Sequence, residues 1–109
     1  MKSKSEVFED FLKSVLTVIS KNSSQSYSIV IMNKLKEELA GEFPFLKWVE
    51  LKGSTVQMDH RMDKVDTSEM GRLLNKIIDV LGPNMLRFFI KEQLDSEDIK
   101  YLNAMGVKF

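Results

Sequence analysis

The clearest pattern of apolar and polar positions lies near the start of the chain, over residues 5–20. Apolar side chains recur there at spacings of three and four, which is the period of one broad helical face. They are Val7, Phe8, Phe11, Leu12, Val15, Leu16, Val18 and Ile19. Ser3 and Glu6 have the spacing of a capping box at the start of this helix, and the polar residues 22–26 predict its end near Lys21.

A second helix is expected over residues 25–40. Its apolar stripe repeats every three or four residues and lies opposite a charged side. The stripe holds Ile29, Met32, Leu35 and Leu39. The run 29–31 also has the β-branched composition of a strand, which opposes the helical pattern near the start of this segment. Gly41 and Pro44 predict the end of the helix.

The period changes to two over residues 46–60. Apolar and polar residues alternate there on both sides of a turn at 52–54, which is centred on glycine. The apolar positions are Val49, Leu51, Val56 and Met58. This pattern predicts a β-hairpin. A hairpin alone is marginal in water, so its apolar face should lie on the helices, and its two open edges could pair with a second copy.

The helical period returns over residues 67–81. Asp66 is the expected N-cap of this helix, and Gly82-Pro83 is expected to end it and to open the next. Gly71 lies in the interior of the helix, where glycine costs up to ~1 kcal/mol relative to alanine. A glycine at this position can permit a close contact with another helix.

Two shorter helices follow. One is expected over residues 84–93, and Asp95-Ser96 caps the next, which ends at Gly106. The predicted fold is α+β and mostly α: two N-terminal helices, a central β-hairpin, then three helices (α-α-β-β-α-α-α). A length of 109 residues suits one domain, so residues 1–109 are expected to form a single compact unit.

Composition narrows the classes of function. Sixteen basic and sixteen acidic residues leave no net charge, so the basic surplus of a typical duplex nucleic-acid binder is absent. The absence of cysteine excludes disulfides, thiol catalysis and thiolate metal sites. Neither a signal peptide nor a stretch of ~18 uncharged apolar residues is found. We expect a cytoplasmic protein that needs no cofactor and does not cross a membrane.

The only histidine, His60, lies among Asp59, Asp63 and Asp66. If residues 58–66 were helical, the three carboxylates would share one face and could hold a hard cation. If the segment were extended, the carboxylates would be divided among local basic partners, with Asp66 left as a helix cap. No zinc or phosphoacceptor motif surrounds His60. The sequence favours an exposed histidine without a chemical role, and a catalytic or metal role for Asp59, His60 and Asp63 is the weaker alternative.

The last helices carry more apolar surface than so small a domain is expected to bury. The predicted helix at 84–93 is apolar almost all round, and Tyr101 and Phe109 add aromatic rings near the end of the chain. We therefore predict a non-enzymatic protein-interaction or regulatory module that acts through an apolar helical surface. The expected contact residues are Phe88, Phe89, Tyr101 and Phe109. A homodimer is the expected assembly, and another protein partner is possible.

A small DNA-binding regulator of the winged-helix type is the main alternative. Lys47, Lys52 and Arg61 would give the hairpin a basic surface, and the last two helices could form a helix-turn-helix. However, the first turn of the last helix is acidic over residues 95–98, and its carboxylates would repel phosphates. Nucleic acid is therefore the weaker prediction.

Overall fold

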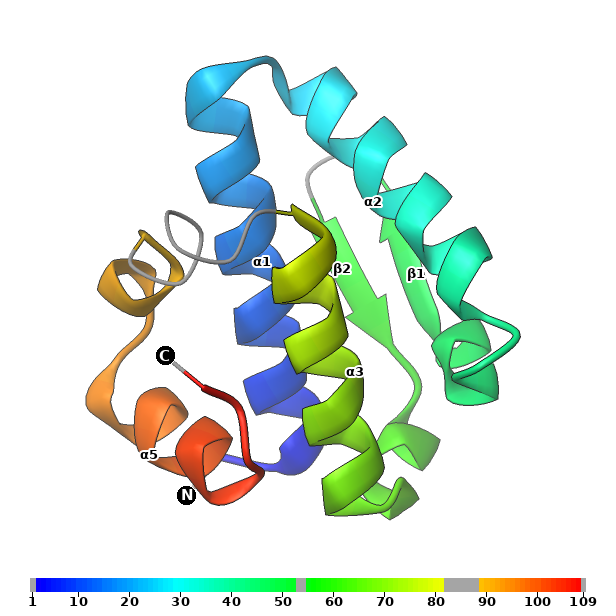
Figure 1. Ribbon diagram of the computed structural model, residues 1–109, viewed down its shortest axis with the longest axis vertical. Helices are drawn as coiled ribbons and strands as arrows, with labels where there is room; N and C mark the ends of the chain where they lie inside the picture. Colours follow the sequence, from blue (N-terminus) through cyan, green and yellow to red (C-terminus); the bar gives the residue numbers. More distant parts are fainter. Residues whose placement is uncertain (1, 53–54, 82–88, 109) are drawn as a thin grey trace.

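The computed structural model describes residues 2–52, 55–81 and 89–108. Its elements follow the predicted order, which confirms a mostly helical α+β fold with a central hairpin (Figure 1). They are α1 (Lys4–Asn22), α2 (Gln25–Leu39), η1 (Pro44–Trp48), β1 (Val49–Lys52), β2 (Thr55–Met58), η2 (His60–Lys64), α3 (Thr67–Leu81) and α5 (Ser96–Ala104), where η marks a 3₁₀ helix. Of the predicted helix at 84–93, residues 89–93 are helical and the remainder lies outside the described part.

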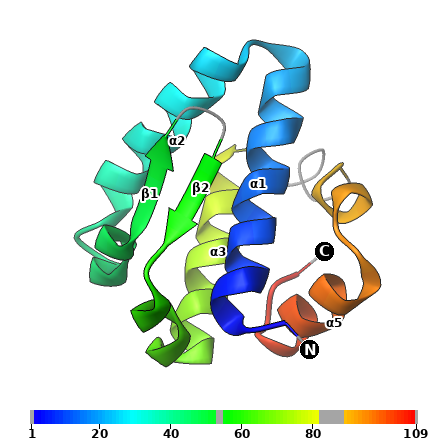
Figure 2. The ribbon, with the colours of Figure 1, turned by 180° about the vertical axis from the view of Figure 1, so that it is seen from behind.

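α1 is the central helix, because it contacts α2, β2, η2 and α5 (Figures 1 and 2). Its predicted apolar face is buried, except that Ile19 is only partly buried. The predicted cap at its start is present: Ser3 Oγ accepts a hydrogen bond from Glu6 N at 3.2 Å and lies 3.1 Å from the Glu6 carboxylate. The largest fully buried side chains of the core are Phe8, Phe11, Phe43, Met62, Met70, Leu73, Leu74, Ile78, Ile90 and Leu102.

The hairpin buries one face on the helices, as its alternating pattern predicts. Val49 pairs with Met58 and Leu51 with Val56, and Val49 and Val56 are buried. Leu51 and Val49 border the same apolar space as Ile77 of α3 and side chains of α1 and α2. Figure 2 shows the two strands between α2 and α1. The hairpin is therefore an integral part of the core.

The predicted hairpin is too long at both ends. Residues 46–48 belong to η1 and His60 opens η2, so neither is part of a strand. Pro44 begins η1, where its fixed φ suits a first helical turn. Asp59 begins η2, because its carboxylate accepts a hydrogen bond from Arg61 N at 2.9 Å. Each 3₁₀ helix has only five residues, which is too short to display a helical period in the sequence.

The caps of the later helices are those that the sequence predicts. Asp66 Oδ1 accepts a hydrogen bond from Ser68 N at 2.8 Å at the start of α3. Asp95 Oδ1 accepts one from Asp98 N, also at 2.8 Å, at the start of α5. Each carboxylate satisfies a backbone donor that has no partner inside its own helix.

The end of α5 is held against α3 at Gly71. A Cβ atom added to this glycine would lie 2.1 Å from the carbonyl oxygen of Met105, so the predicted close contact is confirmed. One turn further along α3, Asn75 Nδ2 donates a hydrogen bond to Gly106 O at 2.9 Å, and Asn75 Oδ1 accepts one from Lys108 N at 3.1 Å. The residues after α5 are thereby attached along α3.

Candidate functional site

The predicted aromatic surface is only partly within the described residues. Phe89 and Tyr101 are both half-buried, and both pack against the hydrophobic core. Phe88 and Phe109 lie outside the described part of the chain. Much of the surface of the Phe89 and Tyr101 rings is therefore already buried within a single copy of the chain.

Large apolar side chains are exposed at three other places in the described ranges. Val30 is 62% exposed, Tyr27 is 54% exposed and Val80 is 53% exposed. Tyr27 and Val30 lie three residues apart on α2, so they are neighbours on one side of that helix, whereas Val80 lies near the end of α3. Ile31 is half-buried and lies one turn from Tyr27. We call Tyr27, Val30 and Ile31 the α2 patch.

The α2 patch is at the start of its helix and has a charged border. Ser24 caps α2 by accepting a hydrogen bond from Tyr27 N at 3.1 Å, which holds the first turn in place. Lys34 continues the same side of the helix, followed by Glu37 and Glu38, and all three are exposed. The apolar half of this outer side therefore precedes a charged half.

One segment of the sequence, the run 29–31, could have pointed to this surface, but it is compatible with either a strand or a helix. The run 29–31 has three consecutive apolar β-branched residues, which also suits a strand. On a helix such a run cannot be buried on one narrow face, because successive residues are turned by about 100°. In the structure Ile29 packs against the core while Val30 faces solvent.

The structure separates the three carboxylates around His60. Asp59 accepts two hydrogen bonds from the Arg61 guanidinium, at 3.1 and 2.9 Å, and these, with a third from Arg61 N, lower the pKa of Asp59 to about 2. Asp63 Oδ1 accepts a hydrogen bond from Ser5 N at 2.8 Å, and Asp66 caps α3. Each carboxylate therefore has a separate partner, which is local for Asp59 and Asp66 but is a backbone donor of α1 for Asp63, not a basic side chain.

His60 itself is exposed at the first position of η2. Across residues 2–52, 55–81 and 89–108, no group of three histidine, aspartate or glutamate side chains is arranged to hold a metal ion. The helical arrangement in which Asp59, Asp63 and Asp66 would share one face does not occur, because the 3₁₀ helix ends at Lys64.

The basic side chains of the hairpin region have acidic or aromatic neighbours. Lys52 Nζ lies 3.1 Å from Glu50, and Arg61 is paired with Asp59. Lys47 and Arg61 both lie over the ring of half-buried Trp48, with distances of 5.6 and 5.4 Å to the ring centroid. Such contacts are attractive. They also make these cationic groups less available for binding the phosphates of a nucleic acid.

The comparisons with known proteins do not identify a relative. No family model, curated protein sequence or solved structure matches the chain. In the described ranges no helix combines the length and the apolar run needed to cross a bilayer. Any functional proposal must therefore come from the surfaces of the molecule.

Proposed function

We propose that the protein is a non-enzymatic interaction module and that its α2 patch binds a second copy of the same chain. The exposure of Tyr27 and Val30 side by side on one helix is the observation that supports this proposal. Removing these side chains from water is the driving force, at about 25 cal/mol for each Å² of apolar surface.

The charges on α2 favour an antiparallel contact between the two copies. In a two-fold arrangement Tyr27 of each copy lies over Val30 of the other, which is the self-complementary contact that such symmetry requires. The two Lys34 side chains then lie at opposite ends, about 16 Å apart along the helix at 1.5 Å per residue. A parallel arrangement would place the two Lys34 ammonium groups side by side, and like charges repel.

The contact is small, so its affinity is expected to be low. Stable interfaces bury roughly 20–30 residues on each side, and the α2 patch has three side chains. Association must also offset an entropic cost of at least about 4 kcal/mol. We therefore expect a reversible dimer with a dissociation constant between about 100 μM and several mM.

The test compares two valine substitutions. Val30→Glu places a charge in the α2 patch, whereas Val80→Glu makes the same change at a similarly exposed valine on α3. Sedimentation and ¹H–¹⁵N spectra from about 50 μM to 2 mM should show concentration-dependent changes at α2 in the wild type and in Val80→Glu, and none in Val30→Glu. A wild-type chain that stays monomeric with unchanged α2 signals over this range would refute the proposal.

Nucleic-acid binding by the hairpin region is the second proposal, and Trp48 is the observation that favours it. The ring borders an open hollow of about 530 Å³ that is lined by Lys36, Lys47 and Arg61, and also by the acidic residues Glu50 and Asp59. Aromatic rings beside cationic groups are typical of surfaces that bind single strands. A mobility shift with a single-stranded oligonucleotide that weakens steeply with salt, and that Trp48→Ala abolishes, is the expected result.

A further inference from the structure

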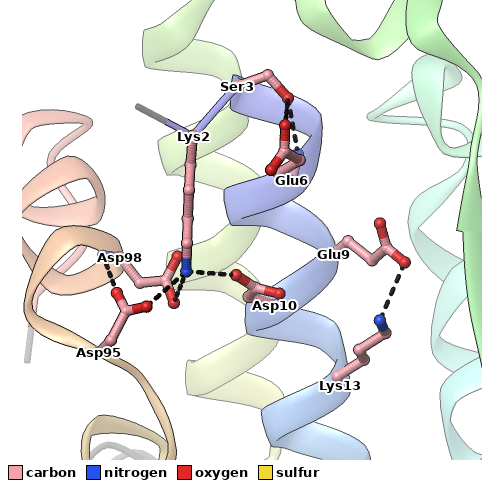
Figure 3. A network of polar contacts seen from close by, with 8 residues as sticks. All are labelled: Lys2, Ser3, Glu6, Glu9, Asp10, Lys13, Asp95 and Asp98. Carbon is pink, nitrogen blue, oxygen red and sulfur yellow. Dashed lines mark hydrogen bonds and ion pairs between the residues drawn. The ribbon is translucent and has the colours of Figure 1, made fainter.

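Three aspartates surround the side chain of Lys2 (Figure 3). Lys2 Nζ lies 2.9 Å from Asp10 Oδ2 on α1, 2.6 Å from Asp95 Oδ2 at the cap of α5 and 3.0 Å from Asp98 Oδ2 in the first turn of α5. The cluster therefore joins the residues before α1 to the last helix of the chain, 93 and 96 positions away.

The three carboxylates differ sharply in their contact with water. The side chain of Asp95 is 56% exposed and that of Asp10 is 35% exposed, but that of Asp98 is only 4% exposed. Asp98 Oδ2 accepts a hydrogen bond from Lys2, whereas no donor among the described residues reaches the buried Oδ1. A buried acceptor without a donor is destabilising, and more so when it is charged.

A proton on Asp98 removes this defect. Protonated Oδ1 becomes a donor, and the Asp10 carboxylate, which is held by the same Lys2 ammonium, is an acceptor in the same cluster. Protonation also reduces the charge of the cluster: Lys2 with three ionised aspartates carries a net charge of −2, and with Asp98 neutral it carries −1. Lys13 lines the hollow beside the cluster and is half exposed, and Glu97 is exposed on the same turn of α5. Neither side chain shares the buried position of Asp98.

The electrostatics of the cluster agree with this geometry. Burial, followed by the Asp10 carboxylate, raises the pKa of Asp98 above its ordinary value of 3.8, although Lys2 acts in the opposite direction. Hydrogen bonds from Lys2 and from Asp98 N lower the pKa of Asp95. Hydrogen bonds to Asp95, Asp10 and Asp98 raise the pKa of Lys2, so its ammonium stays charged at neutral and acidic pH.

We propose that Asp98 is a buried proton-binding group. Its protonation strengthens the contact that holds α5 against α1 and against the residues that precede α1. The contact is a pH-sensitive element that weakens as the pH rises. The pKa of Asp98 is higher in the folded chain than in the unfolded chain. The stabilisation from its protonation is therefore complete at pH values below the ordinary pKa, and it is lost as the pH rises through the pKa of the folded chain.

The experiment uses two matched substitutions in the full chain. Asp98→Asn imitates the protonated acid, because its carbonyl can accept from Lys2 and its amide can donate to Asp10. Asp95→Asn makes the same change of charge three residues away at an exposed position, and asparagine keeps the cap of α5. The ¹³C signals of the side-chain carboxyl groups are followed against pH in the wild type, and the unfolding equilibrium is measured for all three proteins at pH 4 to 7.

The proposal expects Asp98 to titrate above 3.8 and Asp95 below it. At pH 7 Asp98→Asn should unfold no more readily than the wild type. As the pH is lowered from the pKa of Asp98 in the folded chain to its ordinary value, the wild type should gain stability relative to Asp98→Asn. The ratio of the wild-type unfolding constant to that of Asp98→Asn should therefore fall tenfold for each pH unit in this range. Asp95→Asn should have a larger unfolding constant than the wild type at pH 7. An Asp98 midpoint at or below 3.8 would overturn the proposal, and this measurement needs only the wild-type protein.

Discussion

Gly71→Ala should destabilise the protein even though alanine is the better helix former. The residue lies in the second turn of α3, where propensity alone favours alanine by up to about 1 kcal/mol. The opposing effect is steric: the new Cβ atom would lie 2.1 Å from Met105 O and 3.0 Å from Met105 C. An ordinary carbon–oxygen contact is about 3.3 Å or longer, so the backbone at Met105 must move by roughly 1.2 Å.

The cost of that movement can be estimated from the contacts around it. Overpacking a well-filled site typically costs about 1–3 kcal/mol, and here the obstacle is a backbone carbonyl instead of a flexible side chain. The same movement strains the two hydrogen bonds between Asn75 and the residues after α5, each of which contributes about 0.5–1.5 kcal/mol. After the gain in helix propensity is subtracted, we expect a net loss of roughly 1–3 kcal/mol.

Urea unfolding followed by circular dichroism measures this loss, and Gly41→Ala is the matched control. A Cβ atom at Gly41 would have no heavy atom within 4 Å, so that variant should lie within about 0.5 kcal/mol of the wild type. The expected loss for Gly71→Ala corresponds to about 4–8 °C in melting temperature for each kcal/mol. If Gly71→Ala proved as stable as the wild type, the close approach of α5 to α3 would be refuted.

Two further predictions concern single hydrogen-bonded carboxylates. Asp66→Ala removes the cap of α3 at Ser68 N and should lower the unfolding free energy, whereas Asp66→Asn should stay close to the wild type because asparagine also caps helices; chemical denaturation separates the two variants. The pKa of Asp59, held at about 2 by Arg61, should move toward the ordinary value of 3.8 in Arg61→Ala, as read from its carboxyl ¹³C signal. Because folding lowers this pKa, the contribution of Asp59 to stability is present at pH values above the ordinary pKa and is lost as the pH falls through about 2. An unchanged Asp59 midpoint in Arg61→Ala would contradict the ion pair between Asp59 and Arg61.

Local patterns were enough to predict most of the fold. The starts of α1, α3 and α5 each carry a serine or aspartate cap, and in each case the predicted side chain accepts a hydrogen bond at the helix start. Helical periods and caps depend on residues within a few positions of one another, so the sequence displays them directly. The 3₁₀ helices η1 and η2 were not predicted, because five residues do not display a period.

The candidate sites were harder to predict, since they depend on which surfaces meet. Phe89 and Tyr101 were expected at an open surface, and both pack against the core of one copy. Tyr27 and Val30 were assigned to no site, yet both side chains are more than half exposed. The residue types alone do not tell the half-buried side chains from the exposed ones, because an apolar side chain is buried only if another element of the fold covers it.

The order of the helices, their capped starts and the alternating hairpin follow from the sequence alone, because short-range hydrogen bonds and periodicity determine them. The assembly of Lys2, Asp10, Asp95 and Asp98, the contact of Gly71 with Met105 and the exposed side of α2 are set only when the elements pack. Residues up to 96 positions apart meet in the Lys2 cluster, and no local pattern records that proximity. Charge and burial at these sites arise from long-range packing, which is a property of the whole folded chain.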